Sequence, residues 1–325
     1  MHTDLWSIKA EGFSRDEAKV SSNHDVQVQR ETIQGVDALF AAPSTTAAKG
    51  MLFVAHGCSH TNTDWFVDCE NCIGLPEERA IVEMALEEFH FVVVAISSTN
   101  RQSKCWSLRT DMEPVGKVLR ELSGRYKNNG ATSSSSSFPI FAFGASSGGS
   151  FVSGLATPLQ QQFGIQLAGF LSQIAASQTD ETAQCQVYIT MKEDQQTDLR
   201  AQQLLQTATA KGNGATPTPT KHIRVPKLAI TNDYFSSRIP VISSSDSARM
   251  TQALVQANML DADGYLVDSP RQSTWREVLQ SQTPPIGAVT QDPLTPDASP
   301  ISEVMNVADG VHELTRDGVK EGLEF

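Results

Sequence analysis

Long hydrophobic runs are missing from this 325-residue sequence. Its longest apolar stretches, such as residues 51–55 and 91–96, have five or six residues, far fewer than the roughly 20 that a helix needs to cross a bilayer. The first residues also lack the basic segment followed by an apolar one that a secretory signal requires. We therefore expect a soluble, intracellular protein without a membrane span, with the cytoplasm as the default compartment and an organelle left open.

Basic residues and cysteines are scarce as well. The chain has 25 Lys and Arg against 37 Asp and Glu, a net charge of −12, which argues against nucleic acid or an anionic membrane surface as the main partner. Five cysteines are an odd and sparse set for a disulfide-dependent scaffold, so at least one thiol stays free or pairs with another chain. The sequence carries no signal for the oligomeric state.

The part of the chain before residue 211 alternates between strand and helix patterns. A hairpin is predicted over residues 26–42, with its turn at Gln34-Gly35. Continuous apolar runs of strand length follow at residues 51–55, 91–96, 138–143, 166–174 and 185–191. Helical patterns fall between or after them, at residues 76–89, 111–122, 147–159 and 195–209. This α/β alternation predicts a mostly parallel sheet with right-handed crossovers and helices on both faces.

Composition divides the chain into three parts. Residues 1–210 form the predicted core, and a polar Gly/Thr/Pro connector follows at residues 211–220. Residues 221–280 combine a short strand with two helical patterns and predict a small inserted subdomain, helical or winged, that serves as a lid or an interaction module. A second connector at residues 282–300 leads to residues 301–325, a predicted C-terminal core segment.

Residues 144–148 read Gly-Ala-Ser-Ser-Gly and match the pattern G-x-S-x-G. The pattern lies between an apolar strand and a predicted helix, where a sharp turn lifts a serine hydroxyl above the sheet. Such a turn strains the backbone and needs small residues at both flanking positions, which Gly144 and Gly148 supply. We predict that Ser146 is a nucleophile; the alternative is a Gly/Ser-rich turn without chemistry.

A nucleophilic serine needs a histidine base, which this arrangement places after the serine in the chain. Only His222 and His312 follow Ser146. His312 is preferred, because His222 lies beside the Thr/Pro connector. His56 precedes the serine at a strand end and is interpreted as a structural histidine that shapes its loop.

The base in turn needs a carboxylate that orients it. Asp194 lies a few residues beyond the strand at residues 185–191 and is the preferred candidate. Asp233 and Asp309 remain rivals, because carboxylates at such positions also cap helices.

The loop after residues 51–55 carries the other candidate site residues. The N–H groups of Cys58 and Ser147 are the predicted oxyanion hole. Trp65 and Phe66 are candidate substrate-binding residues, with packing of the loop as an equal alternative.

Cys69 and Cys72 form a C-x-x-C pair in the same loop. Together with Cys58 and His60 they have a spacing unlike a known zinc site. We therefore predict a loop staple or two reduced thiols, and no metal site.

In chain order, MLFVAHG, GASSG, ITMKED and GVHEL resemble the α/β-hydrolase superfamily of serine esterases and lipases. More narrowly, HGCSHTNTDWF, CENCIGLPEE and FSSRIP resemble largely uncharacterised plant and algal members. The resemblance implies an eight-stranded, mostly parallel sheet, no cofactor, and hydrolysis of esters. It also implies a triad with Ser146 as nucleophile, Asp194 as acid and His312 as base.

The hypothesis that follows is hydrolysis of a small-molecule carboxylic ester through an acyl-enzyme intermediate. Amide or peptide hydrolysis and acyl transfer stay open, because the same triad performs all of them. A non-catalytic protein of the same fold that binds a ligand in its pocket is the alternative from another class.

Overall fold

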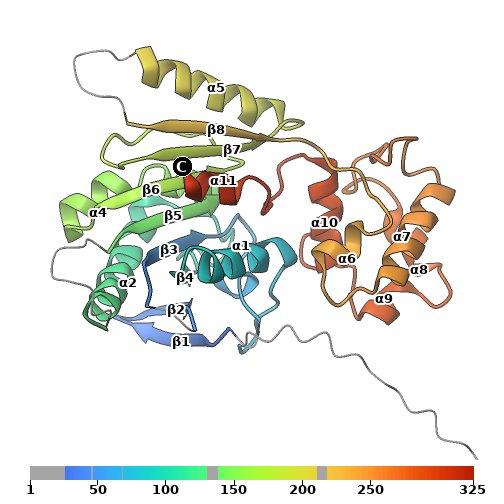
Figure 1. Ribbon diagram of the computed structural model, residues 1–325, viewed down its shortest axis with the longest axis horizontal. Coiled ribbons are helices and arrows are strands. Elements are labelled where there is room, and N and C mark those ends of the chain that lie inside the picture. Colours follow the sequence, from blue (N-terminus) through green and yellow to red (C-terminus); the bar gives the residue numbers. More distant parts are fainter. Residues whose placement is uncertain (1–25, 45–46, 68, 130–137, 211–217) are drawn as a thin grey trace, which may run out of the picture.

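An eight-stranded sheet organises the computed structural model, which describes residues 26–44, 47–67, 69–129, 138–210 and 218–325 (Figure 1). The strands are β1 (Val28–Ile33), β2 (Val36–Ala41), β3 (Gly50–Ala55), β4 (Phe91–Ile96), β5 (Ile140–Ala145), β6 (Leu167–Gln173), β7 (Gln186–Met191) and β8 (Thr220–Val225). Their order is β1-β2-β4-β3-β5-β6-β7-β8. β1 and β2 form the predicted antiparallel hairpin, and β3 to β8 are parallel to one another. The molecule has the α/β-hydrolase fold that the sequence predicts.

Helices cover both faces of the sheet. One face carries α2 (Leu108–Asn129), α3 (Ser147–Val152), α4 (Ala156–Phe163) and α5 (Gln195–Ala210), and the other carries α1 (Pro76–Glu87) and α11 (Val319–Glu324). Side chains alternate along a strand, so Met51 and Phe53 of β3 enter one core, while Leu52 and Val54 enter the other. This double burial explains why β3 reads as a continuous apolar run.

Two of the predicted helices have different limits in the structure. The helix expected over residues 147–159 is divided into α3 and α4, because the chain turns at residues 153–155. Gly154 lies in this turn, and glycine disfavours a continuous helix. The helix expected over residues 111–122 is longer and runs as α2 from Leu108 to Asn129.

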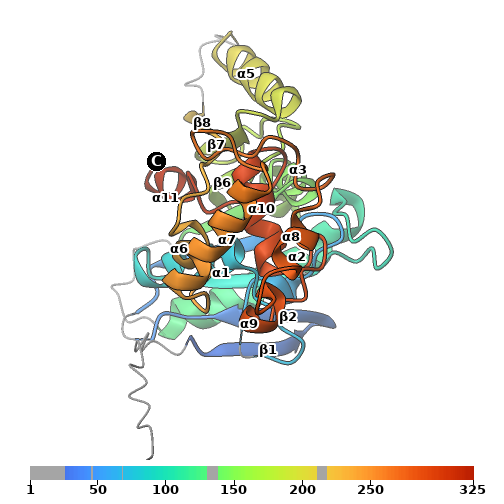
Figure 2. The same cartoon turned by 90° about the vertical axis from the view of Figure 1, so that its right-hand side faces the viewer.

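A helical unit packs against one end of the sheet and faces the viewer in Figure 2. It contains α6 (Tyr234–Arg238), α7 (Ser244–Gln256), α8 (Trp275–Gln280), α9 (Ile286–Thr290) and α10 (Pro300–Asp309). A third core cluster, whose members run from Ile230 to Ala308, holds these helices together. A short 3-10 turn, η1 (Asn62–Asp64), lies in the loop after β3.

The boundaries of this unit correct those expected from the sequence. Residues 220–225 belong to the sheet as β8, so the subdomain does not begin at residue 221. It also continues beyond residue 280 through α9 and α10, and the chain returns to the sheet only after α10. The short α9 escaped sequence analysis because it buries only Ile286 and therefore has no visible period. The unit is helical rather than winged.

Two expectations fall on residues that the structure does not describe: the character of the first residues, within 1–25, and most of the connector at 211–220. Within the described residues, no helix combines the length and the apolar character needed to span a membrane.

Candidate active site

Ser146 occupies a sharp turn between β5 and α3. Its backbone has φ 53° and ψ −115°, a conformation that costs a non-glycine residue energy, and its N–H donates to the Gln173 carbonyl at 2.9 Å. A Cβ on Gly144 would lie 2.3 Å from the Gly148 carbonyl oxygen, and one on Gly148 would lie 2.3 Å from the Ala55 carbonyl oxygen. The two glycines therefore let the turn close against the end of β3.

The structure brings together the three side chains that the sequence singled out. Ser146 Oγ lies 3.1 Å from His312 Nε2, and His312 Nδ1 lies 2.9 Å from Asp194 Oδ2. Burial alone would raise the pKa of Asp194, but the hydrogen bonds from His312 and Thr197 outweigh it and hold that pKa below its usual range. An ionised Asp194 keeps the proton of the imidazole on Nδ1, so Nε2 is free to accept the serine proton.

The rival residues lie elsewhere. His222 stands on β8 with its Nε2 2.7 Å from Thr190 Oγ1 of β7. Asp233 precedes α6 as an exposed residue, and Asp309 accepts a hydrogen bond from Ser269 within the helical unit. Among the contacts of the described residues, none of the three joins the serine and histidine described above.

Two backbone N–H groups next to Ser146 lack hydrogen-bond partners within the described part of the chain. They belong to Cys58, in the loop after β3, and to Ser147, the first residue of α3. The loop approaches closely, since a Cβ on Gly57 would lie 3.9 Å from Ser146 Cβ. Both N–H groups are thus free to donate to an oxygen bound at the serine.

A disulfide holds the loop that carries Cys58. Cys58 is bonded to Cys105, 47 residues later, in the loop between β4 and α2. The sequence analysis missed this pairing, because spacing does not reveal which cysteines are bonded. Cys69 and Cys72 form a second disulfide, which is the loop staple, one of the two alternatives that the sequence left open. Cys185 is free.

His56 has the structural role expected of it. Its Nδ1 donates to the Gly57 carbonyl at 2.6 Å, and its Nε2 accepts from the Ser98 N–H at 3.2 Å. Burial lowers its pKa to about 4. The ring is therefore neutral at physiological pH and fixes the start of the loop.

Trp65 and Phe66 require a correction as substrate-binding candidates. Both side chains are buried in the core between the sheet and α1, and Trp65 packs edge-on against Phe143 with ring centres 5.9 Å apart. Neither lines the cavity beside Ser146. They pack the loop down, which is the alternative that the sequence left open.

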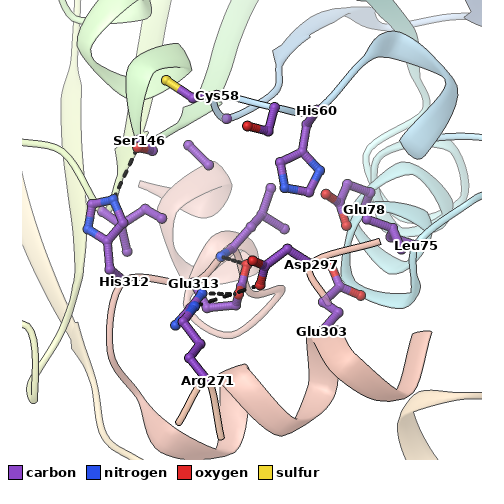
Figure 3. A pocket seen from close by; sticks show the side chains of 15 residues that line it. Cys58, His60, Leu75, Glu78, Ser146, Arg271, Asp297, Glu303, His312 and Glu313 are labelled. Atoms are coloured by element: carbon purple, nitrogen blue, oxygen red, sulfur yellow. Dashed lines mark hydrogen bonds and ion pairs between the residues drawn. The ribbon is translucent and has the colours of Figure 1, made fainter. Parts of the chain in front are cut away.

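A cavity of about 330 Å³ opens beside Ser146. Figure 3 shows Ser146 and His312 on one side of it and Glu78 and Glu303 on the other. Its lining comes from the loop after β3, the start of α1, the serine turn, the segment after α10 and the helical unit. The residues are Gly57, Cys58, Ser59, His60, Leu75, Glu78, Ala145, Ser146, Ile174, Arg271, Asp297, Glu303, His312, Glu313 and Leu314.

Most of the charged lining residues carried no sequence signal. Glu78 and Glu303 lie in helices as ordinary acidic residues of the first turns, and their distance along the chain hides their proximity. Within the described residues, no group of three or more His, Cys, Asp or Glu is placed to hold a metal ion.

No protein-family model and no curated protein sequence matches the chain. Among solved structures, it is similar to a dienelactone hydrolase from Anabaena variabilis, with 14% identity over 62% of this chain and 87% of that one, and a TM-score of 0.40. It is also similar to an esterase from Pyrobaculum calidifontis, with 11% identity over 72% and 86% of the two chains and a TM-score of 0.42. Similarities this distant say nothing of activity, and the narrower resemblance to plant and algal proteins stays a prediction.

Proposed function

We propose that the protein is a serine hydrolase that cleaves carboxylic esters of small molecules. The observation that carries the proposal is the continuous hydrogen-bonded series from Ser146 Oγ through His312 to Asp194, built on a strained turn at the carboxyl end of β5.

The reaction would begin with attack of Ser146 Oγ on the ester carbonyl, while His312 Nε2 takes the serine proton. The N–H groups of Cys58 and Ser147 would stabilise the negative oxygen of the tetrahedral intermediate. His312 would then protonate the departing alcohol, leaving an acyl group on Ser146. A water molecule, deprotonated by His312, would hydrolyse this acyl-enzyme, and Asp194 would stabilise the imidazolium formed in each half of the reaction.

A protein that only binds a ligand has no use for this arrangement. The backbone of Ser146, with φ 53° and ψ −115°, is in a costly conformation that persists where the surroundings impose it, often at reactive sites. This strain supports catalysis over simple binding. Amide hydrolysis and acyl transfer use the same groups.

Labelling with a fluorophosphonate probe tests the proposal. We expect wild-type protein and a Ser150→Ala control, altered within the same helix, to be labelled and to hydrolyse short-chain aryl esters. Ser146→Ala should lose both properties, and His312→Ala should react far more slowly. A folded wild-type protein, checked by circular dichroism, that is neither labelled nor active on any ester would contradict the proposal and favour ligand binding. Labelling with turnover of amides alone would keep Ser146 as nucleophile and change the substrate class.

A further inference from the structure

Two carboxyl groups form the end of the cavity opposite Ser146 (Figure 3). Glu78 belongs to α1 and Glu303 to α10, and both line the cavity although their residues are only 2% and 4% exposed. We call these two residues the acid pair. The proposed hydrolytic steps use neither of them.

Within the described part of the chain, the acid pair forms no ion pair or hydrogen bond with a base, although the nearby charge of His60 opposes the rise in the pKa of Glu78. Among the described residues, neither carboxyl group forms an ion pair, and Glu78 Oε2 is buried without a hydrogen-bond partner. Glu303 Oε2 accepts a hydrogen bond from the Glu77 N–H at 3.2 Å. A hydrogen bond between the two carboxyl groups requires that one of them keeps its proton. Burial accordingly raises the pKa of Glu78 to about 7, and burial beside a second acid raises the pKa of Glu303 well above its usual range.

The bases that line the rest of the cavity are already engaged by other acids. His60 Nδ1 lies 2.8 Å from Asp64 Oδ2, and Arg271 lies 2.7 Å from Glu313 Oε2. Asp297 adds a further carboxylate 3.7 Å from the same arginine. The cavity therefore has an excess of acidic groups. The acid pair is the part of that excess that no ion pair neutralises, and the charge of His60, which is hydrogen-bonded to Asp64, only partly offsets it.

We propose that the acid pair binds a protonated amine of the substrate, so that the esters cleaved at Ser146 carry an ammonium group. This inference rests on the proposed function of the same site. An ammonium group has three N–H donors for the carboxylate oxygens, including the unpartnered oxygen of Glu78. It also supplies the positive charge that makes two buried carboxylates tolerable. A neutral hydroxyl group could donate a hydrogen bond to a carboxylate oxygen, but it would supply no positive charge.

The size and lining of the cavity agree with such a substrate. Its volume of about 330 Å³ lies near the lower limit for ligand sites, which fits a small molecule rather than a long acyl chain. Leu75, Ile174 and Leu314 provide apolar contacts for a short carbon skeleton between the reacting carbonyl and the amine.

Matched substrates test the inference in two series. In one, the amine is in the acyl part: ω-aminoacyl 4-nitrophenyl esters are compared with isosteres that end in methyl. In the other, it is in the alcohol part: aminoalkyl acetates are compared with alkyl acetates. The measured quantity is the ratio of kcat/KM for the ammonium ester to that for its neutral isostere, which cancels any general loss of activity. We expect a ratio of about ten or more in at least one series.

Variants assign the preference to the acid pair. Glu78→Gln and Glu303→Gln should bring the ratio to about one, because a neutral amide does not attract the cation. Glu83→Gln, an exposed position on α1, should keep the wild-type ratio. If the variants of the acid pair fail to fold, wild-type protein provides a second measurement: hexylammonium should slow fluorophosphonate labelling of Ser146 at concentrations where hexanol does not.

The outcomes separate the two proposals. Wild-type protein that is labelled and cleaves neutral esters at least as well as ammonium esters in both series would overturn the inference and leave the hydrolase function intact. A preference that survives in Glu78→Gln and Glu303→Gln would overturn it too. Wild-type protein that is neither labelled nor active on any ester would overturn the function on which the inference rests.

Discussion

Adding one methyl group at Gly148 tests whether the close approach of the serine turn to β3 creates the site. A Cβ at this position would meet the Ala55 carbonyl oxygen at 2.3 Å and the His56 carbonyl oxygen at 2.6 Å. Ordinary contact begins near 3.4 Å, so in Gly148→Ala the turn and the end of β3 must separate by about 1 Å. Both neighbours are backbone atoms and cannot rotate away. The expected cost is about 1–3 kcal/mol of stability.

The same shift should impair catalysis more than stability. His56 leads directly into the loop that carries Cys58, so the displacement moves the oxyanion donor away from Ser146 Oγ. A misplacement of about 1 Å costs on the order of 100-fold in rate. We expect Gly148→Ala to lower kcat/KM for an aryl ester by about that factor, with a modestly lower Tm.

Gly124→Ala is the matched control for this measurement. Gly124 lies in α2, and a Cβ there would meet no atom within 4 Å, so stability should stay equal or rise slightly. Wild-type kcat/KM in Gly148→Ala would refute the argument that this contact positions the site.

Three further predictions concern the residues around Ser146. Asp194→Asn should keep the wild-type Tm within a few degrees but lower kcat by about 10⁴-fold, since the amide favours the wrong tautomer of His312; steady-state kinetics with circular dichroism measure both effects. Burial lowers the pKa of His60, but the hydrogen bond to Asp64 and nearby acids outweigh it and raise that pKa to about 9. Because the folded value exceeds the unfolded value of about 6.5, His60 should contribute about 2–3 kcal/mol that is fully present below pH 6.5 and lost as the pH rises through 9. Denaturant titrations across this range should give free energies of unfolding for wild type and His60→Gln that converge at alkaline pH. A constant difference between the two would contradict the prediction. The double variant Cys58→Ser/Cys105→Ser should lose up to about 4 kcal/mol, the entropy expected for a bridge over 47 residues. Its kcat/KM should fall as well, because Cys58 would no longer be tethered beside Ser146. Unchanged kinetics would show that the disulfide does not position the site.

The strands and the serine turn were predictable because their signals are local. A strand buried on both faces is apolar throughout, as in residues 51–55. The G-x-S-x-G pattern is a run of five neighbouring residues, although Gly148 is required by a contact with the distant Ala55. The choice of Asp194 over Asp233 or Asp309 had no such local signal. Each of these carboxylates stands near a strand or helix end, and only the distance to His312 in three dimensions separates them.

Other features of the cavity depend on distant parts of the chain meeting. Glu78 and Glu303 have ordinary helical surroundings in sequence, and they become an acid pair only because α10 packs against α1. Trp65 and Phe66 failed as substrate-binding candidates for a related reason. The sequence pattern of an aromatic pair after a strand is the same whether the pair faces a cavity or packs beneath a helix.

The two disulfides link the chemistry of the site to its surroundings. One joins the loop with the oxyanion donor to the loop before α2, and the other closes residues 69–72 just ahead of α1, the helix that carries Glu78. The first holds a loop that lines the cavity, and the second lies just ahead of the helix whose Glu78 lines it. Such bonds persist in oxidising compartments and are rare in the reducing cytoplasm that the sequence led us to expect. Thiol alkylation with mass spectrometry on protein from its native source would decide the matter: four blocked cysteines with Cys185 alone reactive would support an oxidising compartment, and five reactive thiols would support the cytoplasm.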